Sequence, residues 1–235
     1  MHSNFIDQVK KSNLGQAWLV LLLTIFFGGS LAGVQIKLGP VIEQNKINET
    51  LEKVPELIMG KALAEKMAAQ QQLTDIRPMR VAVDYEGRQI VYSAYETRYQ
   101  GKMLGWVVKT AGRGYADTIE LLLGLDPTIS RITGLYILDQ KETPGLGNKI
   151  LEEKWRNQFI GKSVNNPVLV VKTGAKGEGE INAISGATIS SSSVTQIINT
   201  ATSQLRPVLA ADTGPAQIKN DREKTSGPEI NSDKE

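Results

Sequence analysis

The chain has 235 residues, with 27 Lys or Arg against 25 Asp or Glu, so its formal net charge is only +2. This balance gives no support for a polyanionic partner, and we expect no nucleic acid to bind. Cysteine is absent and the single histidine is His2. These two facts exclude cysteine-ligated iron–sulfur or zinc sites, a thiol nucleophile and a Ser-His-Asp triad. Any redox chemistry must therefore use an organic cofactor.

Residues 12–36 form an uncharged stretch of 25 residues around the apolar run at 18–27. A helix of this length exceeds the ~20 residues that cross a bilayer. The run is long for the apolar region of a cleaved signal peptide and has no A-x-A cleavage site, and core helices rarely lack charge for so long. We therefore expect a single transmembrane anchor, preceded by a short N-terminal tail at residues 1–11.

The orientation of this anchor depends on the charges beside it. Lys10 and Lys11 adjoin its start, while Lys37, Lys46 and Lys53 follow its end, so the lysine count alone does not fix the orientation. The short tail and the adjoining lysines are typical of a signal anchor. The sequence thus predicts a single-pass protein of the cell (inner) membrane, in contact with membrane lipid, with a cytoplasmic N-terminus and an extracytoplasmic or periplasmic domain.

After the anchor, the composition predicts a mostly helical connector (37–78), one folded domain (79–206) and a disordered tail (207–235). Apolar residues at helical spacing and many Glu, Lys, Ala and Gln predict helix in the connector, with a possible break at Gly60. Few large apolar residues follow Ala211, which is typical of a tail without a packed core.

From Met79 the apolar residues alternate, which predicts strands rather than helices. Residues 79–85 and 89–95 are expected to pair as a hairpin around Glu86-Gly87. Further strands are expected at 104–110, 118–123, 129–139 and 168–172, and helices at 149–160 and 190–205, the second ending at Pro207. This pattern predicts an α+β domain with a largely antiparallel sheet and a few helices.

The segment Ser185-Gly186-Ala187-Thr188 lies immediately before the last predicted helix. Its small residues allow close approach of a ligand to the backbone, and the amides and dipole of a helix start favour a phosphate. Serines 190–193 are expected to cap the free amides of this start. On local physics alone, an ordinary Ser/Thr-rich helix cap after a glycine turn is the favoured explanation of the segment.

A second segment, residues 141–147, reads Lys-Glu-Thr-Pro-Gly-Leu-Gly and follows a predicted strand. Without further context it is a turn from a strand to a helix. The charged residues Asp117, Glu120, Glu152 and Glu153 are expected to be solvated surface charges, with no metal site.

The first of these segments resembles the S/T-G-A-T flavinylation motif of FMN-binding domains. The resemblance implies that Thr188 is joined to the phosphate of FMN by a phosphodiester, made by a dedicated flavin transferase, and that Ser185, Gly186 and Ala187 lie at the cofactor. Members of this family usually carry Asp three residues before the motif, where this chain has Asn182. Asn keeps the size and an acceptor oxygen of Asp but loses the charge, so the modification could be slow if that charge is needed.

Residues 142–147 resemble the E-T-P-G-L-G loop of the same family. The resemblance implies that Glu142 and Gly147 lie beside the flavin, that Thr143 and backbone amides reach the polar edge of its ring, and that Leu146 packs on the ring. Lys172, after the last predicted strand, is a candidate to stabilise the reduced ring or the phosphodiester, with a solvated lysine as the alternative.

The motifs and the single anchor together resemble the G subunits of the Rnf complex, the ion-translocating ferredoxin:NAD⁺ oxidoreductase. The resemblance implies an electron-transfer subunit of a translocase, with no independent catalytic activity. It would relay electrons through covalent FMN between other membrane and peripheral subunits, in a complex that moves Na⁺ or H⁺. The C subunits of sodium-translocating NADH:quinone reductase share both motifs and are an alternative. A second alternative is a membrane-tethered binding module without a cofactor.

Overall fold

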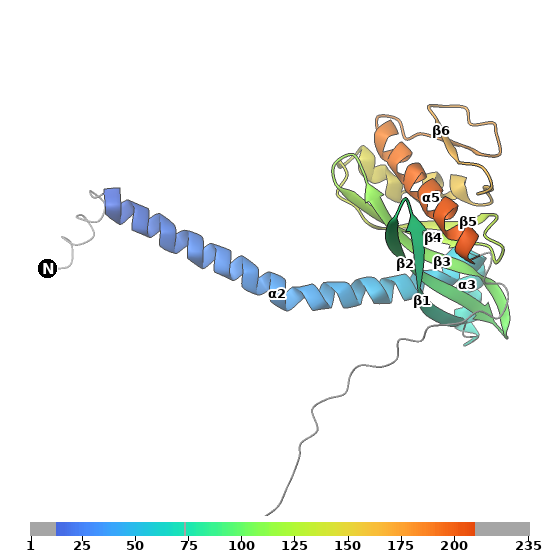
Figure 1. Ribbon diagram of the computed structural model, residues 1–235, viewed down its shortest axis with the longest axis horizontal. Coiled ribbons are helices and arrows are strands. Elements are labelled where there is room, and N and C mark those ends of the chain that lie inside the picture. The colour runs from blue at the N-terminus through green and yellow to red at the C-terminus, as the bar shows by residue number, and fades with distance from the viewer. Residues whose placement is uncertain (1–12, 73, 210–235) are drawn as a thin grey trace, which may run out of the picture.

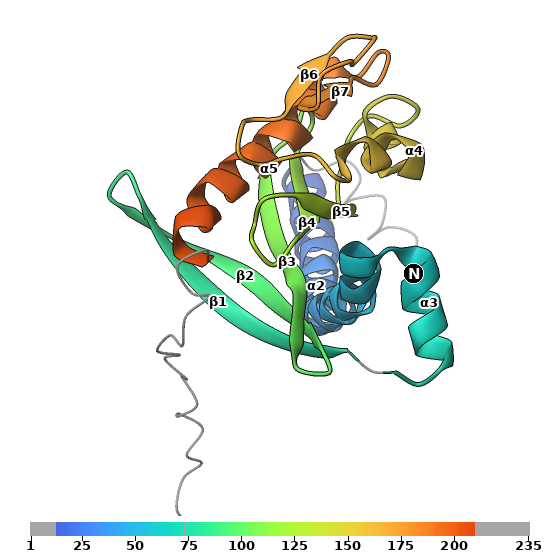
Figure 2. The same cartoon turned by 90° about the vertical axis from the view of Figure 1, so that its right-hand side faces the viewer.

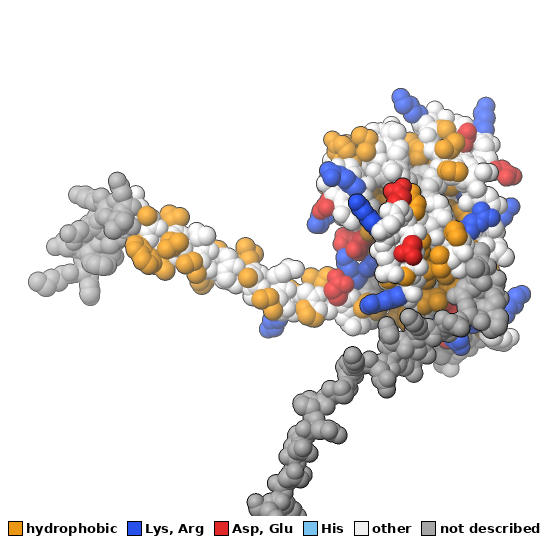
Figure 3. All heavy atoms as spheres, in the orientation of Figure 1, with side chains coloured by type: hydrophobic (Ala, Val, Ile, Leu, Met, Phe, Trp, Pro, Cys, Tyr) orange, Lys and Arg blue, Asp and Glu red, His pale blue; other side chains and the backbone are white. Residues whose placement is uncertain are grey.

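The computed structural model describes residues 13–72 and 74–209, and its first element is one long helix, α2 (Asn13–Met59). No part of its most apolar window is buried, and the helix is long and apolar enough to cross a membrane. Hydrophobic side chains line its first half (Figure 3). Since ~20 residues suffice to span a bilayer, the rest of α2 continues from the anchor to the folded domain (Figure 1).

The helix bends and then stops at a glycine. Pro40 lies inside α2, where its missing amide removes one helical hydrogen bond and accounts for a bend. Gly60 has a φ of +82° and separates α2 from α3 (Lys61–Ala69), so the predicted break is confirmed.

Five consecutive strands form an antiparallel sheet in the order β1-β2-β3-β4-β5, which confirms the predicted α+β class. Their bounds are β1 (Asp75–Tyr85), β2 (Arg88–Tyr99), β3 (Lys102–Arg113), β4 (Thr118–Leu125) and β5 (Ile132–Asp139). Tyr85 pairs with Arg88 around Glu86-Gly87, so the predicted hairpin is also confirmed. Strand β5 begins three residues later than predicted, because Asp126 accepts the amides of Ser130 and Arg131 and holds residues 126–131 in a turn.

A small parallel sheet of β6 (Leu169–Val171) and β7 (Glu180–Asn182) lies apart from the main sheet. Strand β7 was not predicted from the sequence. It is only three residues long and has no alternating apolar pattern, so it is recognised only by its pairing with β6.

The predicted single helix at 149–160 is wrong. The chain forms three short pieces there: η1 (Gly147–Leu151), α4 (Glu153–Arg156) and η2 (Asn157–Phe159). Glu152 has an extended backbone and interrupts the helix. The carbonyl of Leu151 accepts a hydrogen bond from the guanidinium of Arg156. Trp155 and Phe159, four positions apart in the chain, still pack on each other at 5.3 Å between ring centroids.

The last helix, α5 (Thr188–Leu209), begins two residues earlier than predicted and continues through Pro207. Leu205 and Leu209 are both buried, so packing holds this final turn despite the missing proline amide. Most of the predicted tail, residues 210–235, lies outside the described residues, as does the predicted N-terminal tail.

Helices cover both faces of the sheet (Figure 2). The large core lies between the sheet and α5, and the second half of α2 closes a smaller cluster on the other face. The members of this α2 cluster are Val54, Leu57, Tyr95, Val107 and Leu122.

Two glycines allow α2 to lie directly on the sheet. Gly124 and Gly134 are paired across β4 and β5. A Cβ atom at either position would lie 2.6–2.7 Å from the carbonyl oxygen of Leu57. Because real Cβ atoms do not approach so closely, glycine is needed at both positions for this contact. The second half of α2 is therefore part of the folded domain.

Candidate functional site

The segment Ser185-Gly186-Ala187-Thr188 forms the turn into α5. Gly186 has a φ of +79°, a backbone conformation that favours glycine. Ala187 is buried, whereas Thr188 is exposed and is the first residue of the helix. The turn thus presents the threonine side chain to solvent at a helix N-terminus.

The serines that follow do not cap this helix start as predicted. The hydroxyl of Ser191 accepts the amide of Ile184 at 3.0 Å and donates to the carbonyl of Ala187 at 3.0 Å, so it closes the turn before the helix. The hydroxyl of Ser190 instead donates to the carboxylate of Glu142 at 2.5 Å. Both hydroxyls therefore fix the turn to its surroundings.

Glu142 joins three segments of the chain. Its side chain is buried, with 4% of the residue exposed. Oε2 accepts the Ser190 hydroxyl from α5, and Oε1 accepts the amide of Ala116 at 3.1 Å from the turn between β3 and β4. The sequence indicated Glu142 as a site residue, but not this role, which depends on partners 26 and 48 positions away.

Two glycines make room for this carboxylate. A Cβ atom at Gly114 would collide with Oε1 of Glu142, and one at Gly147 would lie 2.7 Å from both Oε2 and the Ser190 hydroxyl oxygen. Neither glycine has a positive φ, so the requirement comes from space alone. The glycine of the turn before β4 and the last glycine of the 141–147 segment therefore serve the same buried junction.

The second motif also contacts the first directly. The side chain of Leu146 lies 3.0 Å from the position that a Cβ atom would occupy at Gly186. Leu146 is 45% exposed, and Ile189 beside Thr188 is similarly exposed. Thr143 is exposed as well, and its carbonyl accepts the amides of Leu146 and Asn148, which shapes the loop.

Asn182 ends β7 of the small parallel sheet that leads into the motif, and Lys172 directly follows β6 of the same sheet. Asn182 pairs with Val171, the residue before Lys172, and Lys172 is exposed. The Asn182 side chain accepts the amide of Ala175 at 2.9 Å and donates to Oε1 of Gln158 at 3.3 Å. The residue that replaces the usual Asp thus has a neutral hydrogen-bonding role.

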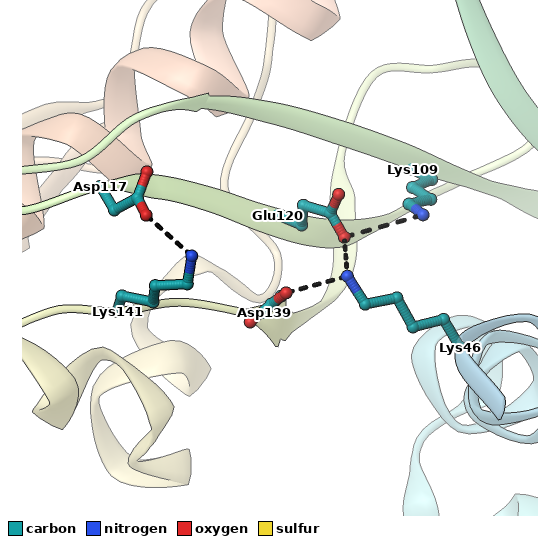
Figure 4. A network of polar contacts seen from close by, with 6 residues as sticks. All are labelled: Lys46, Lys109, Asp117, Glu120, Asp139 and Lys141. Carbon is teal, nitrogen blue, oxygen red and sulfur yellow. Dashed lines mark hydrogen bonds and ion pairs between the residues drawn. The ribbon is translucent and has the colours of Figure 1, made fainter. Parts of the chain in front are cut away.

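Charged groups surround the loop without forming a metal site. Lys141 pairs with Asp117 at 3.0 Å, while Glu120 and Asp139 contact Lys46 of α2 (Figure 4). The hydrogen bond from the Thr118 amide, and next the Lys141 ammonium, lower the pKa of Asp117. Among residues 13–72 and 74–209, no group of three or more His, Cys, Asp or Glu could hold a metal ion.

The residues at this turn fit a phosphorylated aromatic cofactor. Thr188 offers an exposed hydroxyl where helix amides and the helix dipole favour a phosphate. At Gly186 the backbone lies close to Leu146, since a Cβ atom there would be only 3.0 Å from the Leu146 side chain. Exposed apolar side chains, those of Tyr115, Leu146 and Ile189, belong to the segments that meet at this junction and are suited to a flat ring.

The domain that contains this turn is similar to known proteins. The family model described as FMN-binding domain matches residues 114–203. The chain is 36% identical over 127 residues to the G subunit of the Na⁺-translocating ferredoxin:NAD⁺ oxidoreductase complex of Acetobacterium woodii, covering 53% of this chain and 60% of that protein. It is 34% identical over 131 residues to the G subunit of the ion-translocating oxidoreductase complex of Methanosarcina acetivorans, covering 55% and 67%.

A solved structure supports the fold. The crystal structure of NqrC from Shewanella oneidensis superposes with a TM-score of 0.54 over 66% of this chain and 91% of that one, at 16% sequence identity. The identity is too low to carry more than the fold. On the sequence matches, the chain belongs to the family of G subunits of ion-translocating oxidoreductase complexes and carries the FMN-binding domain of that family.

Proposed function

We propose that this protein is a membrane-anchored electron-relay subunit whose FMN is bound covalently, through a phosphodiester, to Thr188. The observation that carries the proposal is the position of Thr188 as the exposed first residue of α5, in a turn that Glu142 ties to the 141–147 loop. Bound FMN supplies one- and two-electron transfer, which suits a chain that has no cysteine and whose single histidine is His2.

The chain's own residues would bind and orient the cofactor. The Thr188 oxygen would hold the phosphate, with the first-turn amides of α5 beside it. Leu146 would pack on the ring, and Thr143 and its loop amides would lie at the polar edge of the ring. Lys172, exposed at the end of β6, would offer positive charge near the phosphodiester.

Covalent attachment is tested by in-gel fluorescence after co-expression with a flavin transferase. Thr188→Val should abolish flavin fluorescence on a denaturing gel without changing the unfolding temperature. Thr200→Val is the matched control, since it makes the same change at an exposed threonine of the same helix, and it should keep the fluorescence. Fluorescence of the Thr188→Val protein would refute the assignment. A wild-type chain that never fluoresces would favour the binding module without a cofactor.

The Asn182 side chain gives a second test of the flavinylation motif. Asn182→Asp keeps the acceptor for the Ala175 amide but loses the donor to Gln158. If a carboxylate is needed for recognition by the transferase, this variant should carry more FMN per chain than wild type. Equal occupancy would show that Asn serves as well as Asp at this position.

We also propose that the N-terminus is cytoplasmic and that the folded domain is extracytoplasmic, where it would exchange electrons with other subunits of an Rnf-type complex. The absence of cysteine allows clean single-site labelling. A membrane-impermeant maleimide applied to intact cells, after permeabilisation of any outer membrane, should label Ser226→Cys and spare Ser3→Cys. The reverse labelling pattern would place the domain in the cytoplasm and contradict the proposed relay.

A further inference from the structure

The two loops of the candidate site leave the sheet at the same place. The turn that contains Ala116 leads into β4, and the loop that contains Glu142 follows β5. Near these strand ends Glu120 of β4 is paired directly with Asp139 of β5. Two carboxylates directly opposite each other on adjacent strands repel and destabilise the pairing, so a cation is needed there.

That cation comes from the membrane helix. The ammonium of Lys46 in α2 lies 3.2 Å from Oε2 of Glu120 and 2.8 Å from Oδ2 of Asp139, between the two carboxylates (Figure 4). The Lys46 and Glu120 side chains are 22% and 27% exposed and Asp139 is 46% exposed, so solvent screens the contact with Glu120 less than it screens the contact with Asp139. Three turns later, Leu57 rests on the glycine pair of β4 and β5. The helix therefore contacts both ends of the same strand pair.

Other cations near the strand ends do not replace Lys46. Lys109 approaches Glu120 from β3 at 3.7 Å. The Lys141–Asp117 pair joins the two loops, but these side chains are 73% and 47% exposed, and such surface pairs contribute little. Among the ion pairs of the described residues, Lys46 is the cation that contacts both paired carboxylates.

We propose that Lys46 is a positioning residue for the flavin site, which couples the membrane helix to the two loops that meet at Glu142. By neutralising Glu120 and Asp139 it holds together the strand ends from which the loops start. The inference rests on the proposed function, in which the two loops form the FMN site. It adds that the geometry of the site depends on a residue of the membrane helix and that the domain is docked on its own anchor.

The test measures amide hydrogen exchange of the full-length protein in detergent micelles. The reporters are the loop amides bonded within the site: Gly114 to Asp117, and Leu146 and Asn148 to Thr143. Lys46→Met should speed exchange of these amides about fivefold or more, while amides in the middle of the sheet stay protected. Lys37→Met is the matched control on the same helix, because Lys37 is exposed and takes part in none of the ion pairs found among the described residues.

Two further variants separate charge neutralisation from a general loss of stability. Lys46→Arg keeps the cation and should keep the loops protected. Asp139→Asn in the Lys46→Met background removes the repulsion and should restore protection. Unchanged loop exchange in Lys46→Met, an equal rise across the whole sheet, or failure of both rescues would overturn the proposal. Repeating the series in Thr188→Val, which lacks the attachment oxygen, keeps this result independent of whether FMN is attached.

Discussion

Leu57 offers the most direct measure of how firmly α2 belongs to the domain. Its side chain is 5% exposed and packs in the α2 cluster with Val54, Tyr95, Val107 and Leu122. Leu57→Ala removes three carbon atoms, which at ~0.8 kcal/mol each gives a loss near ~2.5 kcal/mol. The remaining cavity adds to this, because the backbone of Leu57 rests on two glycines and has little room to settle. We expect a total loss of about 2.5–5 kcal/mol in the free energy of unfolding.

The assay is chemical and thermal unfolding of the full-length chain in detergent, followed by tryptophan fluorescence. A loss of this size lowers the unfolding temperature of a domain of 150–250 residues by about 5–20 °C. Leu63→Ala is the control, since Leu63 lies on α3 with 48% of its surface exposed. Its effect should stay within about 0.5 kcal/mol.

An equal, small effect of both substitutions would refute the reasoning. It would mean that the second half of α2 is only a tether and that the domain folds without it. A large effect of Leu57→Ala would also specify how a soluble fragment should be made. Such a fragment should retain the second half of α2, because a start at β1 would expose Val107 and Leu122, which are fully buried in the whole chain.

Two further predictions concern buried or partly buried carboxylates. Glu142→Gln should lower the free energy of unfolding by only about 1 kcal/mol, because the new amide can accept the hydrogen bond from the Ala116 amide and donate one to a rotated Ser190 hydroxyl. Glu142→Ala should lower it by about 3 kcal/mol, because both partners lose their hydrogen bond. Equal shifts of the denaturant midpoint in the two variants would contradict this prediction. Burial raises the pKa of Asp126, but hydrogen bonds from Ser130 and neighbouring groups outweigh it and lower the pKa overall. Its stabilisation is therefore present above the ordinary value of 3.8 and disappears as the pH falls through the lowered pKa. Asp126→Asn should destabilise by about 1–2 kcal/mol at pH 7, and a loss that stayed constant down to pH 3 would contradict the assignment.

Local patterns were sufficient to predict the main sheet. Alternation from Met79 onward, with Glu86-Gly87 at the turn, indicated the first hairpin, and three more strands followed from short apolar runs. Strand pairing in this sheet is between neighbours in the chain, so no long-range information was needed. The error at 149–160 has a local cause too. The spacing of Trp155 and Phe159 is the same in a continuous helix and in short pieces joined at an extended Glu152, so the pattern could not distinguish them.

The candidate site was predictable as a set of motifs, but not as a structure. Nothing in the spacing of Glu142 and Ser190 shows that they meet, since 48 positions separate them. Gly147 lies in a segment predicted only as a turn, and its requirement for space, like that of Gly114, is visible only once the Glu142 carboxylate lies against both glycines. Such contacts are set by how the loops pack, which single-sequence periodicity does not report.

The role of α2 shows why a change in composition is a poor guide to a domain boundary. The loss of apolar character after residue 36 predicts a connector, and in its charge pattern the following segment resembles one. Whether this segment packs on the domain depends on a glycine pair more than 60 residues away, at Gly124 and Gly134, which lets the helix backbone reach the sheet. Because the glycines act on α2 only after β4 and β5 have paired, the docking of the anchor is a property of the assembled sheet. It follows that a substitution in the sheet, such as Gly134→Ala, should alter how the domain is held at the membrane even though it touches neither the span nor the candidate flavin site.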